Sequence, residues 1–195
     1  MSIINRATKE LTFKIIYYGP PFAGKTTNLV QLHRQSAGKL VSLATSSDRI
    51  LYFDITSVKD TPVRGFTPVF QIYTVPGQVI FNSTLQLVLR GVDGIVFVAD
   101  SQYDKMGENV ESFNKMEENL KTLKLDLANI PCVLQYSKQD LTTSHKAPTA
   151  YMEQLLNNGA VKMPSFVSNA TRCEGVLETF NALTTMLLDK FVQKV

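Results

Sequence analysis

The sequence predicts an α/β protein in which a mostly parallel sheet is covered by helices on both faces. Segments typical of strands alternate with segments typical of helices along the chain. Two stretches, "GIVFVAD" and "IPCVLQYS", are apolar over most of their length, as in strands covered on both faces. The last helical segment repeats apolar residues every three or four positions: Val176, Phe180, Leu183, Leu187 and Phe191. Because β-then-α order needs crossover connections, we expect these to be right-handed.

The individual elements follow in chain order from these patterns. Strands are expected at 11–18, 40–45, 50–55, 67–74, 94–100, 132–136 and 165–167, and helices at 25–35, 83–90, 107–123, 149–157 and 175–193. Two stretches do not fit the alternation: "SLATSSDR" is small and polar, and "SVKDTPVRGF" is rich in turn-forming residues. The segment 56–70 is interpreted as a strand that changes register in a conformational cycle.

Composition favours one globular domain over residues 1–195. Hydrophobic residues make up 44% of the chain and charged residues 19%. A net charge of +3 without a basic run argues against nucleic-acid binding. No apolar run approaches the roughly 20 residues of a membrane span, and the first residues lack a signal-peptide core. We therefore expect a cytoplasmic protein, monomeric by default, without an integral membrane segment.

The two cysteines, Cys132 and Cys173, show no spacing typical of a metal site. In a cytosolic protein such cysteines are ordinarily reduced thiols. We therefore expect neither a disulfide nor a cysteine-bound metal.

The stretch "GPPFAGKT", residues 19–26, matches the phosphate-binding P-loop pattern G-x-x-x-x-G-K-[ST]. It follows an expected strand and opens an expected helix, the context this motif requires. Glycines let backbone N–H groups curl around phosphate oxygens, and the helix N-terminus favours an anion. Lys25 would reach the β- and γ-phosphates, and the Thr26 hydroxyl would ligate Mg²⁺. The expected nucleotide-binding residues here are Gly19, Ala23, Gly24, Lys25, Thr26 and Thr27.

The stretch "SKQD", residues 137–140, indicates guanine rather than adenine. In GTP-binding proteins an [NT]-K-x-D sequence follows the corresponding strand, and Ser137 here replaces the usual Asn. The Asp140 carboxylate would accept hydrogen bonds from guanine N1–H and its 2-amino group, donors that adenine does not offer there. Lys138 would lay its aliphatic stem over the base. A plain polar strand end is the other reading of this stretch.

Two further signals complete the predicted site, and the second of them is the weaker. In "TVPGQ", Gly77 can offer its N–H to a γ-phosphate and Gln78 can orient the attacking water. After the last strand, the backbone N–H groups of Ser168, Asn169 and Ala170 could cover the guanine O6. The sequence therefore predicts binding of GTP and GDP with Mg²⁺, and Gln78 as a catalytic residue.

Taken together, these stretches resemble the MglA family of bacterial Ras-like small GTPases, named for mutual gliding motility. The resemblance covers nearly the whole chain through "KIIYYGPPFAGKTTNL", "SDRILYFD", "YTVPGQ" and "LRGVDGIVFVADSQ". Most Ras-like proteins carry Asp where this chain has Thr74. The resemblance implies a P-loop NTPase of the Ras-like fold that acts as a nucleotide-dependent switch.

The resemblance also implies functional residues and partners. It places an intrinsic arginine finger at Arg49 and its acidic neighbour, a possible Mg²⁺ ligand, at Asp48. With Lys25 and Gln78, Arg49 forms the expected catalytic set, since a guanidinium stabilises charge on the transferring phosphoryl group. It further implies a roadblock-type (MglB-like) GTPase-activating protein, effectors of cell polarity and motility, and recruitment to a cell pole through partners.

Three residues depart from the family pattern. Pro21 stands where the family usually carries Gly and has no N–H to donate. Ile50 replaces a Thr whose hydroxyl ligates Mg²⁺, and Thr74 lacks the charge of the more usual Asp. Binding stays the expectation, whereas hydrolysis is open. The alternatives are a cycling GTPase, a nucleotide-binding scaffold held in one state, and a P-loop kinase or ATPase, which Asp140 argues against.

Overall fold

A computed structural model describes residues 3–35, 41–44, 49–56, 62–74, 82–142, 145–159 and 162–194. The strands are β1 (Ile3–Asn5), β2 (Glu10–Tyr18), β3 (Val41–Ala44), β4 (Arg49–Thr56), β5 (Thr67–Thr74), β6 (Gly94–Asp100), β7 (Cys132–Ser137) and β8 (Ser165–Val167). The helices are α1 (Lys25–Arg34), α2 (Asn82–Leu89), α3 (Met106–Thr122), α4 (Thr149–Leu156) and α5 (Val176–Lys194). Two short 3₁₀ helices, η1 (Tyr103–Lys105) and η2 (Leu127–Asn129), complete the described elements.

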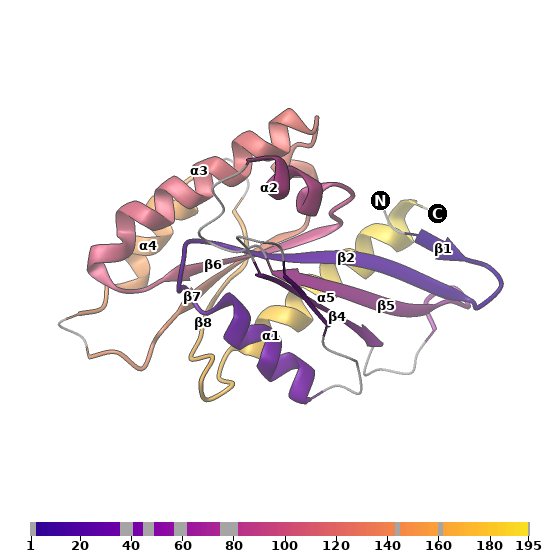
Figure 1. Cartoon of the computed structure of the whole chain (residues 1–195), viewed down its shortest axis with the longest axis horizontal. Helices are drawn as coiled ribbons and strands as arrows, with labels where there is room; N and C mark the ends of the chain where they lie inside the picture. The colour runs from indigo at the N-terminus through magenta and orange to yellow at the C-terminus, as the bar shows by residue number, and fades with distance from the viewer. Residues whose placement is uncertain are drawn as a thin grey trace.

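These strands form one mostly parallel sheet, in the order β3-β4-β5-β2-β6-β7-β8 (Figure 1). The pairs β2–β5, β2–β6, β6–β7 and β7–β8 are parallel, whereas β3–β4, β4–β5 and β1–β2 are antiparallel. The bounds of β5, β6 and β8 agree with the sequence expectation, and each other expected element differs from the structure by one residue at one or both ends. The α/β class with a mostly parallel sheet is therefore confirmed.

Helices cover both faces of the sheet, and each face has its own apolar core. On one face, side chains of α1 and α5 pack on β2, β5, β6 and β7 around Leu29, Val98 and Leu183. On the other, α2, α3 and α4 pack around Leu89, Phe97 and Met116. Figure 1 shows these two helical layers on opposite sides of the central strands. The predicted apolar stripe of α5 is buried as expected, which explains its spacing.

The structure differs from the expected strands in two places: one strand was missed, and one expected strand was wrong. The sequence pattern did not predict β1, which pairs with the start of β2 and is exposed. The segment 56–70 is not one strand: β4 ends at Thr56, β5 begins at Thr67, and a tight turn precedes β5. In that turn Val63 and Phe66 exchange both backbone hydrogen bonds, at 2.9 and 3.1 Å. Gly65 has a φ of 82° there, so turn geometry interrupts the extended backbone.

The carboxyl ends of β2, β6, β7 and β8 lie along one edge of the sheet, because neighbouring strands among them are parallel. Ligands of open α/β sheets bind outside this edge. The loops that follow β2, β7 and β8 carry the three predicted nucleotide-binding stretches that the structure describes. The topology therefore brings together residues more than one hundred positions apart.

Candidate functional site

The P-loop joins β2 to α1, as its sequence context predicts. Gly19 follows β2 directly, and a Cβ placed on it would lie 2.1 Å from the Val98 carbonyl oxygen of the neighbouring strand. Gly24, with a φ of 97°, caps α1 in a left-handed conformation that favours glycine. These two glycines fix where the loop starts and ends.

Lys25 is held inside its own loop. The side chain is only 6% exposed, and its Nζ donates to the Gly19 carbonyl oxygen at 2.8 Å and the Pro20 carbonyl oxygen at 2.5 Å. Burial lowers the pKa of Lys25 to about 8. A phosphate group beside this ammonium would offset the lost solvation and favour the charged form. The geometry therefore suits an anion-binding lysine.

Neither proline of the loop has a backbone N–H to donate, and Pro20 contributes its carbonyl instead. The Pro20 carbonyl accepts from Lys25 and, at 3.4 Å, from the Ala23 N–H. Ala23 is fully buried, whereas Phe22 is 79% exposed at a positive φ of 59°. A bulky residue with this backbone conformation is uncommon. Pro20 thus helps to close the loop around Lys25, which gives this proline a structural role.

The first residues of α1 fit a magnesium ion held with a nucleotide. Thr26 lies in the first turn and is exposed, so its hydroxyl oxygen can serve as a ligand; Thr27 beside it is half-buried. Mg²⁺ prefers oxygen ligands and is often bound by one or two protein groups together with waters and phosphates. The described residues hold no cluster of three or more His, Cys, Asp or Glu side chains suited to a metal. A hydroxyl-and-phosphate site needs no such cluster.

Asn28 in α1 was not predicted from the sequence. Its side-chain Nδ2 donates to the Gly24 carbonyl at 3.0 Å, while its Oδ1 is buried without a partner among the described residues. The Asn28 side chain therefore stabilises the end of the P-loop through its hydrogen bond to Gly24. Its place in "GKTTNL" was the available signal, but that spacing alone gives no role.

The predicted base-recognition loop follows β7 and is tied to the end of β6. The Ser137 hydroxyl donates to the Ala99 carbonyl at 2.9 Å. Lys138 Nζ lies 2.5 Å from Asp100 Oδ2 and 2.9 Å from Gln102 Oε1. Asp140, the residue expected to read guanine, has an exposed side chain. The carboxylate is thus accessible at the edge where a base would lie.

The third predicted stretch lies next to this loop, because the Gln139 N–H donates to the Ser168 carbonyl at 3.1 Å. The N–H groups of Ser168 and Asn169 donate to the carbonyls of Tyr136 and Glu174, at 2.8 and 3.0 Å. These two N–H groups are therefore already hydrogen-bonded within the protein, whereas the sequence analysis expected them to face guanine O6. Ala170, 7% exposed, carries the remaining N–H group of the stretch.

Several predicted residues fall outside the described part of the chain. Gly77, Gln78 and Asp48 lie outside it. The structure describes the backbone of Arg49, which begins β4 and pairs with Ala44 of β3. Thr74 is 2% exposed at the end of β5, at the point where the chain leads toward Gly77.

Three residues near the base loop were not predicted: Asp100, Gln102 and Asn109. Asn109 of α3 forms two hydrogen bonds with the Asp100 backbone, at 2.9 and 2.8 Å. Gln102 donates its N–H to Asp100 Oδ1 at 3.0 Å. For Asp100 and Gln102 the available signal was the polar sequence "DSQ" at the end of an apolar strand, which places side chains at the carboxyl edge of the sheet.

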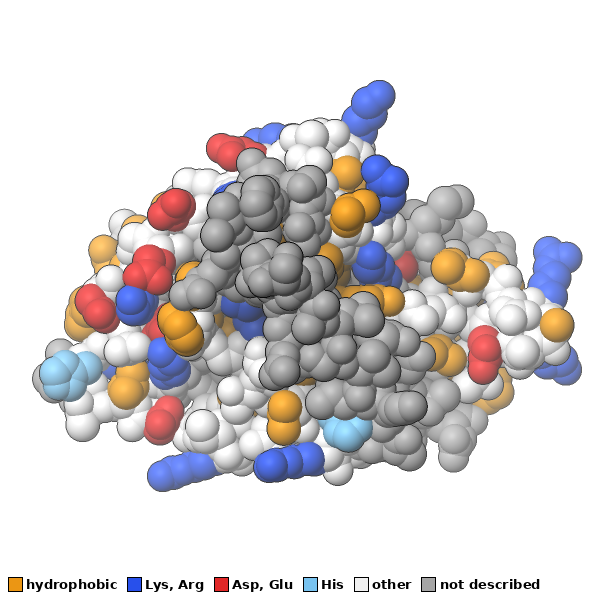
Figure 2. Space-filling view, in the orientation of Figure 1, with side chains coloured by type: hydrophobic (Ala, Val, Ile, Leu, Met, Phe, Trp, Pro, Cys, Tyr) orange, Lys and Arg blue, Asp and Glu red, His pale blue; other side chains and the backbone are white. Residues whose placement is uncertain are grey.

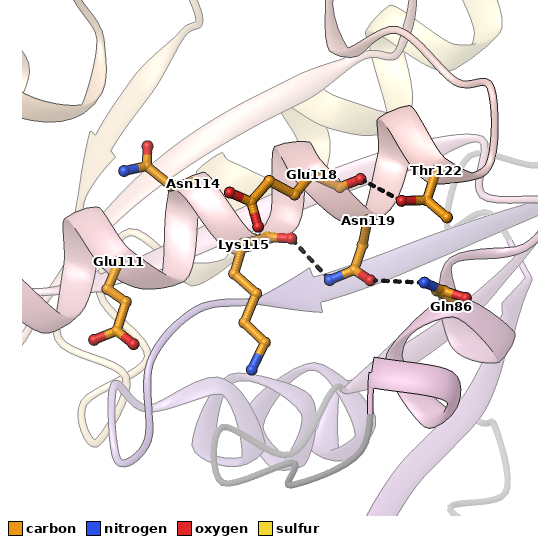
Figure 3. A pocket seen from close by; sticks show the side chains of 7 residues that line it. All are labelled: Gln86, Glu111, Asn114, Lys115, Glu118, Asn119 and Thr122. Atoms are coloured by element: carbon orange, nitrogen blue, oxygen red, sulfur yellow. Dashed lines mark hydrogen bonds between the residues drawn. The ribbon is translucent and has the colours of Figure 1, made fainter.

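A separate groove of about 440 Å³ lies between α2 and α3. Figure 3 shows its polar lining, mostly from one face of α3, with Asn119 bonded to Gln86 of α2 at 3.3 Å. None of the predicted nucleotide-binding residues lines it: the lining is Gln86, Glu111, Asn114, Lys115, Glu118, Asn119 and Thr122. On the face seen in Figure 2, basic and acidic described side chains are interspersed. No described helix is long and apolar enough to cross a membrane.

Comparison with known proteins finds similarity over nearly the whole chain. The ADP-ribosylation factor family matches the chain over residues 1–187. The mutual gliding-motility protein MglA of Myxococcus xanthus (strain DK1622) is 41% identical over 192 residues, which cover 96% of this chain and 96% of that protein.

Proposed function

Because the chain belongs to the ADP-ribosylation factor family and is an MglA-type Ras-like small GTPase, we propose that it hydrolyses GTP to control cell polarity and motility. Proteins of this class are GTP-binding switches that bind GTP and GDP, typically with Mg²⁺.

The observation that carries the proposal is that Lys25 is buried and hydrogen-bonded within the P-loop. Lys25 is buried at the start of α1, and two carbonyls of its own loop fix the position of its ammonium group. Such preorganisation lowers the cost of ordering when an anion binds. The charge of this ammonium and the N-terminus of α1 both favour the nucleotide phosphates.

In the proposed site, each edge loop has one task. The loop 19–26 binds the phosphates, and Thr26 would hold Mg²⁺, whose chemistry is to neutralise charge on the β- and γ-phosphates. Asp140 binds the guanine N1–H and 2-amino group, and Lys138 covers the base. Ala170 offers its N–H to guanine O6. Gly77, Gln78 and Arg49, with Asp48 nearby, would act on the γ-phosphate.

The switch would work through order and disorder of the segments around the γ-phosphate. A roadblock-type activating protein would bind the GTP state, and polarity or motility effectors would read it. The 41% identity to a protein named for gliding motility supports this assignment.

The experiment that tests the proposal identifies the nucleotide carried by the purified chain and follows single-turnover GTP hydrolysis on the same sample. Bound GDP with measurable turnover supports the cycling switch. Retained GTP without turnover, even after addition of an MglB-like partner, would contradict hydrolysis and support a scaffold held in one state. Equal affinity for ATP and GTP would contradict guanine recognition.

The variant Asp140→Asn tests the base assignment directly. The side-chain amide of the variant would donate a hydrogen bond to the 2-oxo group of xanthine. It would no longer provide the two carboxylate acceptors that guanine needs. We expect weaker GDP binding and stronger binding of xanthosine diphosphate. Asp126→Asn, at the N-cap of η2, is a matched control that removes an exposed carboxylate elsewhere.

A further inference from the structure

We infer that Asp100 is a positioning residue for nucleotide binding, which acts by holding Lys138 over the base site. This inference rests on the proposed function. It assigns a role to a strand-end carboxylate that lies outside the P-loop and outside the "SKQD" stretch.

The geometry starts with an ion pair between the last residue of β6 and the residue that follows β7. Lys138 Nζ lies 2.5 Å from Asp100 Oδ2, although the two residues are 38 positions apart. The Asp100 side chain is 1% exposed, whereas that of Lys138 is 30% exposed. A buried carboxylate without its cation is costly. Lys138 is therefore held by the charge that it compensates.

Asp100 itself is fixed from several sides. Its Oδ1 accepts from the Gln102 N–H at 3.0 Å. Its backbone N–H donates to Asn109 Oδ1 at 2.9 Å, and its carbonyl accepts from Asn109 Nδ2 at 2.8 Å. With both oxygens and the backbone bonded, the carboxylate has little freedom to follow the lysine. It works as an anchor rather than as a mobile partner.

Neighbouring residues repeat the same connection. Ser137 bonds to Ala99, and Gln139 Nε2 donates to Ser101 Oγ at 2.8 Å. Lys138 also bonds Gln102 at 2.9 Å. Three consecutive residues of the base loop thus donate to four consecutive residues at the end of β6. We call this set, residues 99–102 with 137–139, the β6 clamp.

The backbone of Lys138 shows why a clamp is useful. Its φ is 60°, a left-handed conformation that non-glycine residues seldom adopt. The Lys138 carbonyl accepts from Leu141 N–H at 3.2 Å, so the chain turns sharply there. Such a conformation persists only where surrounding contacts determine it. Since Asp140 follows two residues later, the clamp also sets where that carboxylate stands.

A double-mutant cycle on the full chain tests the inference. The variants are Asp100→Asn, Lys138→Met and the two combined, and the readout is the Kd of fluorescently labelled GDP at constant ionic strength. We expect Asp100→Asn to raise Kd by roughly tenfold to a hundredfold, because a charge-assisted bond is lost. We expect the double variant to match Lys138→Met within about twofold, because Asp100 acts through that lysine.

The matched control is Asp104→Asn, which removes an exposed carboxylate four residues away. It should leave Kd unchanged. The inference would be overturned if the Kd increases of the two single variants multiplied in the double variant. It would also be overturned if the Kd of Asp100→Asn stayed within about twofold of the wild-type Kd. In that case a wild-type chain that binds GDP still supports the proposed function; a wild-type chain that does not bind guanine nucleotides contradicts the function itself.

A second variant keeps the test decisive if Asp100→Asn does not fold. Gln102→Ala removes the half-buried second acceptor and leaves the carboxylate in place. We expect a Kd increase of about threefold in the wild-type background and no increase beside Lys138→Met. An equal increase in both backgrounds would show a role that does not pass through Lys138.

Discussion

The carbonyl oxygen of Val98 in β6 occupies the space that a side chain at Gly19 would need. A Cβ built on Gly19 would lie 2.1 Å from that oxygen, far inside van der Waals contact. Gly19 also has a φ of 142°, which side-chain-bearing residues rarely adopt. The P-loop can therefore leave β2 at this point because glycine allows β6 to approach.

Replacing Gly19 by Ala should disturb both the fold and the phosphate site. The clash is with backbone, so the strand or the loop must shift, and we expect the free energy of unfolding to fall by at least about 2 kcal/mol. Urea unfolding and GDP titration measure the two effects. Gly107→Ala in α3 is the control, since a Cβ there meets nothing within 4 Å; it should be neutral or stabilising by up to about 1 kcal/mol.

The pH dependence of GDP binding should report Lys25. Its pKa in the free protein is lowered to about 8 by burial, and a bound phosphate favours the charged lysine. The free protein therefore loses its Lys25 proton first as pH rises. GDP affinity should be level below about pH 8 and fall above it, by at most about tenfold per pH unit.

Titrations of GDP between pH 6.5 and 9 check this expectation. Guanosine serves as the control ligand, because it shares the titration of the base but carries no phosphate for Lys25. A fall of the same size for guanosine would assign the effect to the base rather than to the lysine.

The buried pair Gln135 and Thr179 should show the asymmetry of hydrogen bonds in a core. Gln135 Nε2 donates to Thr179 Oγ1 at 3.1 Å, and both residues are fully buried between β7 and α5. Thr179→Val removes the acceptor and leaves a buried amide unpaired, so we expect a loss of about 1–3 kcal/mol in unfolding free energy. Adding Gln135→Leu should recover part of that loss, as urea unfolding would reveal.

The two thiols should differ strongly in reactivity. Cys132 is 3% exposed, and burial raises its pKa to about 12. Cys173 is half-buried, and its sulfur lies 2.9 Å from Gln35 Nε2. A thiol reagent at pH 8 should therefore label Cys173 quickly and Cys132 only after denaturation. Cys173→Ser should abolish the fast phase; a remaining fast phase would mean that Cys132 is accessible in the native protein.

The sequence by itself determined the features that depend on neighbouring residues. The P-loop was predictable because its glycines, lysine and threonine act within eight consecutive positions. The bounds of β5, β6 and β8 agreed with expectation, and for β6 the reason is local, because all of its residues form one buried run. Strand β1 was not predicted, because its three residues are all exposed and show no alternation of buried and exposed positions.

Only the tertiary structure decided which distant residues support these motifs. Asp100 meets Lys138 because β6 and β7 run parallel with Asp100 opposite Ser137, a register that no local pattern contains. Gly19 meets Val98 for the same kind of reason, since Tyr18 pairs with Phe97 across β2 and β6. Local chemistry identifies the groups that can touch a nucleotide, whereas strand order and register determine the backbone and charges that hold them in place.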